Sequence, residues 1–506
     1  MQEESVKPVA WKLKKTKREI MEFFPYAEPR QVQIDILKAI EQHWDKYDVF
    51  VVVAPTALGK SSILKTVAAW RNNASIIVPT NILVSQMAAA FPGMQKLQKR
   101  ALYKCPRFGD GRMSCEEAYK KYGGKKLGCN RECDYLKDNA RARGRGYGVY
   151  NYYTYMANKL YKPTLLVDEA HNILKVLQDL GAQKIWRHDY KYPWDMWTGG
   201  DILKWLEDIE AGMLNEEPLP EVLQGLREEL TSSSPRYIIK RGKDLWARTS
   251  PPEERELLTM LPVDTSDAPP VLWPGGKISK IVLLSATISY KDIEGMGLGK
   301  RRTLYLEASS PIPSSNRPII RDYVGNVNRA NLREQTLAMC KKIEDEYLTR
   351  FAGSKGVIHA TYQQAKIFRE YFGDNERFIF HTKDDTKERF KDFCEAPPES
   401  GKILVASGLY EGIDLVEDLG RWQIVAKIPW LSLGDPAIKY RSGQDEAWYI
   451  WEALKVTMQC CGRICRTPTD NGETFVLDSG FERLYSQARR FDLVPKWWDD
   501  AIVNIS

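Results

Sequence analysis

Residues 54–61, Ala-Pro-Thr-Ala-Leu-Gly-Lys-Ser, have the composition of a loop that binds phosphate. Such a loop points backbone N–H groups at phosphates, and the N-terminus of the helix behind it adds favourable potential. The first glycine of the usual Gly-x-x-x-x-Gly-Lys-Ser/Thr pattern is missing, but an apolar strand precedes the loop and an apolar-periodic helix follows it. We therefore expect nucleotide binding. Lys60 would reach the β- and γ-phosphates and the Ser61 hydroxyl would hold Mg²⁺, with Thr56 and Gly59 as further contacts.

An acidic pair after a second apolar run meets another requirement of phosphoryl transfer. Asp168 and Glu169 directly follow Leu-Leu-Val at 165–167 and precede Ala-His. Asp168 can organise the metal ion, and Glu169 can orient or deprotonate the attacking water. A pair that merely faces solvent is the alternative, and the upstream loop makes it the weaker interpretation.

Phosphoryl transfer also needs positive charge near the transferred phosphate. In residues 459–466, Gln-Cys-Cys-Gly-Arg-Ile-Cys-Arg, the two arginines are three residues apart, which predicts that they share one face of a helix. Arg463 and Arg466 are our candidates for this charge.

The strands and helices around these motifs alternate, which predicts an α/β fold with parallel sheets and chemistry at the carboxyl ends of the strands. We expect strands at 50–53, 75–80, 165–167 and 281–287. A second α/β unit begins near residue 311, with strands at 356–359, 378–380, 403–406, 423–426 and 474–478. Residues 179–271, rich in Trp, Glu and Pro, predict a mostly helical insertion. A basic helical lead-in is expected over residues 7–18.

Four cysteines, Cys105, Cys115, Cys129 and Cys133, lie in the most basic stretch of the chain. Residues 96–145 hold 15 Lys/Arg against 6 Asp/Glu, whereas the net charge of all 506 residues is +7. Tyrosines alternate with these basic residues, and the mixture suits a polyanion whose bases can stack. The cysteine spacings do not match a two-knuckle zinc ribbon, although four thiolates suit either zinc or an iron–sulfur cluster. Free core cysteines are the third alternative.

The composition indicates the kind of compartment in which the protein works. Nine cysteines without a paired pattern indicate a reducing compartment, with metal binding rather than disulfides. No segment approaches the roughly 20 apolar residues that cross a bilayer, and the N-terminus shows no secretory signal. We expect a cytoplasmic protein with no membrane partner.

The motifs, in this order, resemble those of superfamily 2 helicases of the iron–sulfur XPD/DinG type, over about residues 28 to 480. Gln33 resembles the glutamine that reads adenine, with Gln31 as the competing candidate. Thr80 falls in a segment similar to motif Ia. The later segments resemble, in chain order, motif II at 168–171, motif III with Ser285 and Thr287, motif V with Glu411 and Asp414, and motif VI with Gln459 as an ATP contact.

This resemblance implies an ATP-dependent DNA helicase or translocase that uses ATP and Mg²⁺ and moves 5′→3′ on single-stranded DNA. It implies two RecA-like parallel-sheet lobes, a 4Fe–4S cluster on the four cysteines as wedge or strand guide, and an arch-like role for the helical insertion. By the same resemblance, His171 couples the lobes, and residues of motifs Ia, III and V link hydrolysis to DNA.

We therefore divide the chain into lobe 1 (1–100, 146–178 and 272–310), an iron–sulfur insertion (101–145), an arch-like insertion (179–271) and lobe 2 (311–506). The expected partners of this monomer are single-stranded and forked DNA, in the cytoplasm of a bacterium or of a phage-infected host. Two alternatives stay open. One is a remodeller of R-loops or RNA–DNA hybrids on the same motor, and the other is a weakly active ATP-binding clamp with a zinc module.

Overall fold

The computed structural model describes residues 18–55, 57–108, 113–129, 133–190, 199–212, 218–243, 256–268, 270–408, 415–467 and 469–504. These residues form two compact units. One contains the chain up to Lys46, Ser61–Leu166 and Lys277–Lys280, and the other contains Tyr47–Lys60, Val167–Gly276 and the chain from Ile281. The helical lead-in predicted for residues 7–18 lies outside the described residues, apart from Arg18.

The first large sheet has seven strands in the order β10-β1-β9-β5-β2-β4-β3, and the strand pairs described in it are parallel. Its strands are β1 (Val49–Val53), β2 (Asn73–Val78), β3 (Gln95–Leu97), β4 (Gly146–Asn151), β5 (Thr164–Val167), β9 (Lys280–Ser285) and β10 (Thr303–Glu307). The four strands predicted here are confirmed to within two residues at each end, whereas β3, β4 and β10 were not predicted.

Helices separate these strands, as the alternation predicted. They are α1 (Gln31–His43), α2 (Lys60–Arg71), α3 (Asn81–Ala90), α6 (Tyr152–Ala157), α7 (Ile173–Leu180) and α11 (Tyr290–Gly295). The apolar positions of α1 recur at helical spacing, and its buried face includes Ile36, Leu37 and Ile40. β1 and β5 read as continuous apolar runs because every residue in each of them is buried.

The second large sheet is also parallel in its described pairs, with the order β13-β14-β12-β15-β16-β11-β17. Its strands are β11 (Ile319–Gly325), β12 (Gly356–Ala360), β13 (Phe378–Phe380), β14 (Ile403–Ser407), β15 (Trp422–Val425), β16 (Glu473–Asp478) and β17 (Ile502–Asn504). The five strands predicted for this unit are confirmed, and β11 and β17 are additional. Its helices include α12 (Leu332–Lys342), α14 (Tyr362–Phe372), α15 (Thr386–Glu395), α16 (Pro436–Gln444), α17 (Glu446–Cys461) and α18 (Gly480–Arg490).

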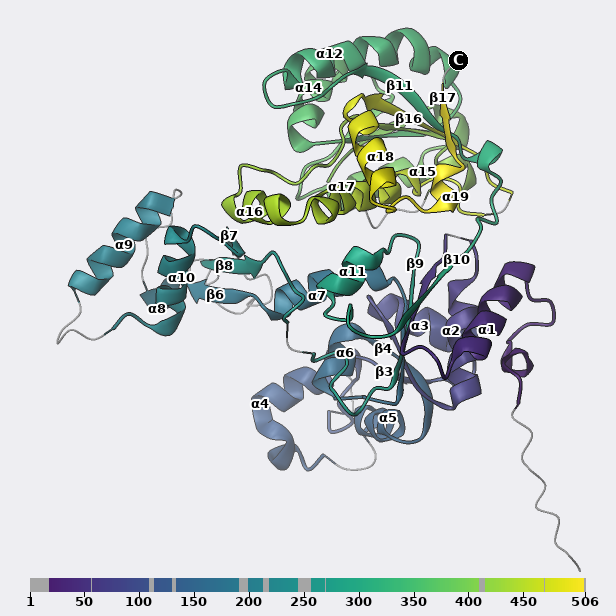
Figure 1. Ribbon diagram of the computed structural model, residues 1–506, viewed down its shortest axis with the longest axis vertical. Coiled ribbons are helices and arrows are strands. Elements are labelled where there is room, and N and C mark those ends of the chain that lie inside the picture. The colour runs from purple at the N-terminus through teal and green to yellow at the C-terminus, as the bar shows by residue number, and fades with distance from the viewer. Residues whose placement is uncertain are drawn as a thin grey trace, which may run out of the picture. The chain divides into compact units, whose positions relative to one another are not determined.

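Alternation along the central strands assigns these helices to two faces (Figure 1). Ile424 and Phe475 belong to the core that contains α12 and α14, whereas their neighbours Val425 and Val476 belong to the core that contains α17 and α18. Successive residues of a strand point to opposite faces, so helices cover both sides of this sheet. α17 therefore follows one face of the sheet and ends just before residues 462–466.

The insertion at 179–271 is only partly helical, so the prediction of a mostly helical segment is wrong in part. Two of its helices are α9 (Gly199–Ala211) and α10 (Glu221–Thr231). They share a core with an antiparallel sheet in the order β6-β8-β7, formed by β6 (Gln183–Trp186), β7 (Tyr237–Lys243) and β8 (Glu256–Pro262). These short strands are far apart in sequence, and their β structure depends on pairing and packing that periodicity does not report.

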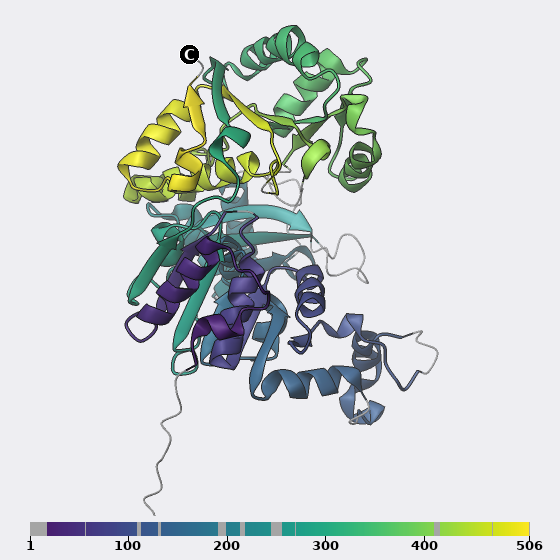
Figure 2. The ribbon, with the colours of Figure 1, turned by 90° about the vertical axis from the view of Figure 1, so that its right-hand side faces the viewer.

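The cysteine-rich segment forms its own helical pair, α4 (Cys115–Leu127) and α5 (Asp134–Arg143). α4 is kinked at Gly123, whose φ of +68° leaves the helical region. Both helices are drawn in blue in Figure 2, and α5 contacts β3 of the first sheet. No helix in the described part of the chain combines the length and apolar character needed to cross a bilayer.

Candidate functional site

The loop between β1 and α2 has the backbone of a phosphate cradle. Ala54 extends the sheet by donating its N–H to the Ser285 carbonyl oxygen at 2.8 Å. Ala57 and Gly59 then have φ of +65° and +82°, in the left-handed region that glycine alone adopts without steric cost. α2 begins at Lys60, so the N–H groups of its first turn have no partner within the helix ladder and suit an anion.

Lys60 forms an ion pair with the glutamate that follows β5. Its Nζ lies 2.7 Å from Oε1 of Glu169, and the side chain of Lys60 is only 13% exposed. Asp168, the residue next to β5, is buried and accepts the N–H of Glu169 at 3.1 Å. Glu169 itself has φ of +47°, so the chain turns sharply between the two carboxylates. One ammonium thus stands among two carboxylates at the ends of buried strands.

The pKa values of this cluster differ in direction. Burial, reinforced by the charge of Glu169, raises the pKa of Asp168 to about 6. Burial also acts to raise the pKa of Glu169, but the charges of Lys60 and His171 outweigh it and hold that pKa below its usual value. Lys60 shows the opposite balance, because the two carboxylates overcome its burial and raise its pKa. Two carboxylates against one ammonium leave negative charge that a Mg²⁺ ion would neutralise.

A chain of polar contacts runs from this cluster to β9. His171 Nδ1 lies 3.5 Å from Oε2 of Glu169 and 2.8 Å from the hydroxyl of Ser285. The side-chain nitrogen of Asn172 lies 3.1 Å from His171 Nε2, so both ring nitrogens have a polar neighbour. The same hydroxyl accepts the N–H of Thr287 at 3.1 Å. The contacts connect residues that the sequence grouped as motifs II and III.

The two arginines do not share a helix face, so that prediction is wrong. α17 ends at Cys461, and Arg463 and Arg466 lie in the turn beyond it. Arg463 Nε donates to the Gln459 carbonyl oxygen at 2.7 Å, and Arg466 donates from a terminal guanidinium nitrogen to the Gly462 carbonyl oxygen at 2.9 Å. The side chains therefore fold back on the end of the helix.

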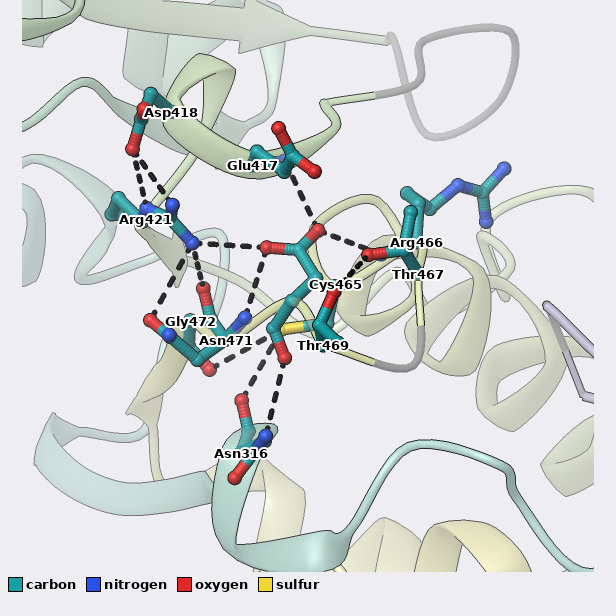
Figure 3. A network of polar contacts seen from close by, with 11 residues as sticks. Asn316, Glu417, Asp418, Arg421, Cys465, Arg466, Thr467, Thr469, Asn471 and Gly472 are labelled. Atoms are coloured by element: carbon teal, nitrogen blue, oxygen red, sulfur yellow. Dashed lines mark hydrogen bonds and ion pairs between the residues drawn. The ribbon is translucent and has the colours of Figure 1, made fainter.

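Beyond the end of α17, the backbone N–H of Arg466 has an acceptor outside the helix. The carboxylate of Asp470 accepts it at 2.9 Å, and Cys465 adopts φ of +60° to make the turn (Figure 3). Sequence reasoning missed Asp470, although a carboxylate four residues after Arg466 in a Thr-Pro-Thr-Asp-Asn-Gly turn was a signal for it. The charge of Arg466 still reaches the cluster, since it acts to lower the pKa of both Lys60 and Glu169, as one of the smaller contributions to each.

The remaining predicted residues have local roles in the structure. The Gln33 side chain is buried and accepts the N–H of Arg30 at 2.9 Å, whereas Gln31 pairs with Asp35 at 2.7 Å on the exposed side of α1. Thr80 caps α3 by accepting the N–H of Leu83. Gln459 is buried near the end of α17. The structure does not describe Thr56, Glu411 and Asp414.

The four predicted cysteine ligands line one cavity of about 130 Å³. Cys105, Cys115 and Cys133 are buried, and Cys129 is exposed. The fold positions two of them at the starts of helices, because Cys115 begins α4 and Cys133 precedes α5. Burial, reinforced by the nearby Cys133, raises the pKa of Cys115 to about 11, so that thiol is protonated unless a metal or cation stabilises the thiolate.

Positive and aromatic side chains complete the wall of this cavity. Arg100 lies over the rings of Tyr119 and Tyr135, at 4.1 and 4.7 Å, and Arg107 donates to the Gly128 carbonyl oxygen at 2.9 Å. Within the described residues, no three Cys, His, Asp or Glu side chains are close enough together to hold a single metal ion. Four thiols are a donor set that suits either zinc or an iron–sulfur cluster.

Comparison with known proteins agrees with this architecture. Residues 336–501 match the helicase C-terminal domain family. Among solved structures, Xpd4 from S. tokodaii is 14% identical with a TM-score of 0.56, over 94% of this chain and 100% of that one. An XPD helicase structure is 14% identical with a TM-score of 0.59, over 95% and 100%. An apo XPD structure is 15% identical with a TM-score of 0.55, over 94% and 100%. No curated protein sequence matches the chain.

The fold and the site together define the class of protein. The two parallel seven-stranded sheets have the α/β, two-lobe RecA-like arrangement of XPD helicases, as predicted. The helicase C-terminal domain and the Lys60–Asp168–Glu169 cluster support a helicase-type ATPase that uses ATP and Mg²⁺. The chain thus contains a match to the helicase C-terminal domain and has a fold like that of XPD helicases.

Replacing Lys60 tests the cluster. Lys60→Ala removes the ammonium that pairs with Glu169 and leaves two carboxylates facing the phosphates. We expect ATP hydrolysis to fall by about 100-fold or more, with binding of nucleic acid largely retained. Phosphate release and oligonucleotide anisotropy measure the two properties.

Lys38→Ala on the exposed side of α1 is the matched control and should hydrolyse ATP at the wild-type rate. Retained turnover in Lys60→Ala would show that this loop is not the phosphate site.

Proposed function

We propose that the chain is an ATP-dependent DNA helicase or translocase that moves 5′→3′ on single-stranded DNA. The observation that carries the proposal is the ion pair of Lys60 with Glu169 beside the buried Asp168, at the ends of β1 and β5. When phosphate binds, it would replace a protein carboxylate as the partner of Lys60. The charges of the site are already in place, so this exchange needs little rearrangement. The direction of movement rests on the resemblance of the motifs to the XPD/DinG group.

Each residue has a distinct task in this mechanism. The γ-phosphate takes the place of Glu169 as the partner of Lys60, and Glu169 is then free to orient the attacking water. Ser61 and Asp168 would hold Mg²⁺, which would supply positive charge to neutralise the phosphates. Arg466 and Arg463 add positive charge as the phosphoryl group transfers. Gln33 would contact the adenine.

The polar chain through His171 gives hydrolysis a route to the nucleic-acid contacts. Loss of the γ-phosphate changes the charge beside Glu169, and His171 transmits that change to Ser285 and Thr287 through the contacts already described. Thr80, Glu411 and Asp414 are the proposed nucleic-acid contacts of the motor.

The polynucleotide that activates the enzyme tests the proposal. We expect single-stranded DNA to stimulate ATP hydrolysis more strongly than single-stranded RNA of the same sequence, and duplexes with a 5′ overhang to be unwound in preference to those with a 3′ overhang. Preference for RNA–DNA forks would identify a remodeller of hybrids instead. Absence of any stimulated hydrolysis would leave a nucleotide-binding clamp and overturn the proposal.

The cysteine cavity is the proposed site of a 4Fe–4S cluster. The support is that all four cysteines line one cavity and that Arg100 and Arg107 also line it, where they offset the negative charge of thiolates. When bound, the cluster would tie α4 and α5 together through Cys115 and Cys133. The basic and aromatic surface around it would then guide a strand of DNA.

Cys129→Ser tests the cavity. We expect the variant to lose bound iron and acid-labile sulfide, and to lose unwinding more than the ATP hydrolysis that proceeds without DNA, because the cavity is not part of the nucleotide cluster. Metal analysis, the visible charge-transfer absorbance of anaerobically purified protein and both activities measure this.

Cys394→Ser, outside the four, is the control and should keep its iron. Zinc in place of iron in the wild-type protein would refute the iron–sulfur cluster. Equal loss of unwinding and ATP hydrolysis in Cys129→Ser would mean that the cluster has a purely structural role.

A further inference from the structure

Asp470 is a buried carboxylate that gathers donors from separate segments of the second sheet. Its side chain has no exposed surface. Oδ1 accepts from a guanidinium nitrogen of Arg421 at 3.0 Å and from the N–H of Asn471 at 2.9 Å. Oδ2 accepts from the N–H of Glu417 at 3.0 Å and from the N–H of Arg466 at 2.9 Å. Both carboxylate oxygens are therefore fully engaged, and every partner is a donor (Figure 3).

Two of these donors connect the arginine turn to the segment that follows residues 409–414. Glu417 and Arg466 share one oxygen of Asp470, and the N–H of Leu415 donates to the Arg463 carbonyl oxygen at 3.1 Å. Hydrogen bonds thus connect residues 415–417 to the turn both at Arg463 and at Arg466. A shift of Asp470 would move the backbone of Arg466 directly.

Packing leaves the arginine turn little freedom to adjust. Ile464, between the two arginines, is buried against Gly420 and Gly472. A Cβ at Gly420 would lie 2.9 Å from Ile464, and one at Gly472 would lie 2.8 Å from it, so both positions need glycine for this close approach. The Cys465 thiol donates to the Asn316 carbonyl oxygen at 3.3 Å. Hydrogen bonds and close packing together fix where Arg466 leaves the backbone.

We propose that Asp470 is a positioning residue that holds Arg466 in place for the charge developing on the transferred phosphate. This inference rests on the proposed function, since it assumes that Arg466 acts on ATP. The backbone N–H of Arg466 donates to the Asp470 carboxylate at 2.9 Å, whereas the guanidinium of Arg466 has no dashed line to the residues drawn in Figure 3. The carboxylate thus acts on the backbone, and the guanidinium would exchange its present partner, the Gly462 carbonyl oxygen, for phosphate. An error of about 1 Å in such a group is enough to slow a reaction by about 100-fold.

Asp470→Asn is the sharpest test because it keeps the shape and changes the chemistry. All four partners are donors, so the new amide NH₂ must face two of them wherever it points. We expect kcat for ATP hydrolysis to fall by about 10- to 100-fold, while the KM for ATP and the affinity for single-stranded DNA change by less than about 2-fold. A general loss of structure would move all three.

A double-mutant cycle separates positioning from mere stability. If Asp470 acts through Arg466, Asp470→Asn has no further effect on kcat in an Arg466→Ala background. Multiplied losses in the double variant would overturn the inference. Asp418→Asn is the matched control: this exposed carboxylate contacts Arg421 at 2.7 Å, so the control removes the same charge from Arg421 and leaves Arg466 undisturbed. Its kcat should stay at the wild-type value.

Two further measurements keep the inference falsifiable. If Asp470→Asn does not fold, as judged by thermal unfolding, Asp470→Glu keeps the carboxylate but displaces it by one methylene, and it should show the same selective loss of kcat and the same dependence on Arg466. Wild-type protein that does not hydrolyse ATP would count against the proposed function. Wild-type activity that is lost in Arg466→Ala but kept in Asp470→Asn would overturn only the role of Asp470.

Discussion

One ammonium among two carboxylates, Lys60 with Glu169 and Asp168, is the interaction on which the rest of the structure depends. Burying these charges is costly, and a buried ion pair adds little to stability over apolar residues of the same size. The pair is instead suited to exchange, because phosphate can replace one carboxylate and a metal ion can balance the other. The fully buried strands β1 and β5 hold these groups rigidly enough for that exchange to be specific.

Beside the second sheet, a buried charged group holds a backbone atom in place. Arg463 and Arg466 follow the end of α17. The backbone N–H of Arg463 donates to the Cys460 carbonyl oxygen, whereas the buried carboxylate of Asp470 accepts that of Arg466. The helices on one face of the sheet support the end of α17, and close contacts at Gly420 and Gly472 hold Ile464 between the arginines. In the cysteine segment, the fold likewise places Cys115 and Cys133 at the starts of α4 and α5.

Much of this arrangement was predictable from the sequence. The strands around Lys60 and Asp168 are continuous apolar runs, since they are buried on both faces, and such runs are easy to recognise. The strands β6, β7 and β8 were missed because their pairing joins distant segments. The strands β3 and β17 have only three residues each, and Arg321 and Asp322 interrupt the apolar residues of β11. The turn at Arg463 was mistaken for helix, because residue spacing does not reveal that α17 ends at Cys461.

Some residues of the candidate site could be predicted from the sequence, and others could not. The residues of the phosphate loop and the acidic pair follow from motif and position, whereas the carboxylate that supports Arg466 is visible only from its contacts. The number of cysteines and the basic charge around them made these residues candidates, whereas the cavity that they share is visible only in the structure. Residues that touch substrate are thus easier to find than the residues that position them.

The most direct test of the central claim is the binding and turnover of Mg²⁺–ATP by Glu169→Gln. If Lys60 exchanges Glu169 for phosphate, removing the carboxylate charge should leave nucleotide affinity equal to or tighter than that of the wild type. Hydrolysis, which needs Glu169 to orient water, should fall by about 100-fold or more. Turnover at the wild-type rate, or loss of nucleotide affinity in parallel with turnover, would contradict the account.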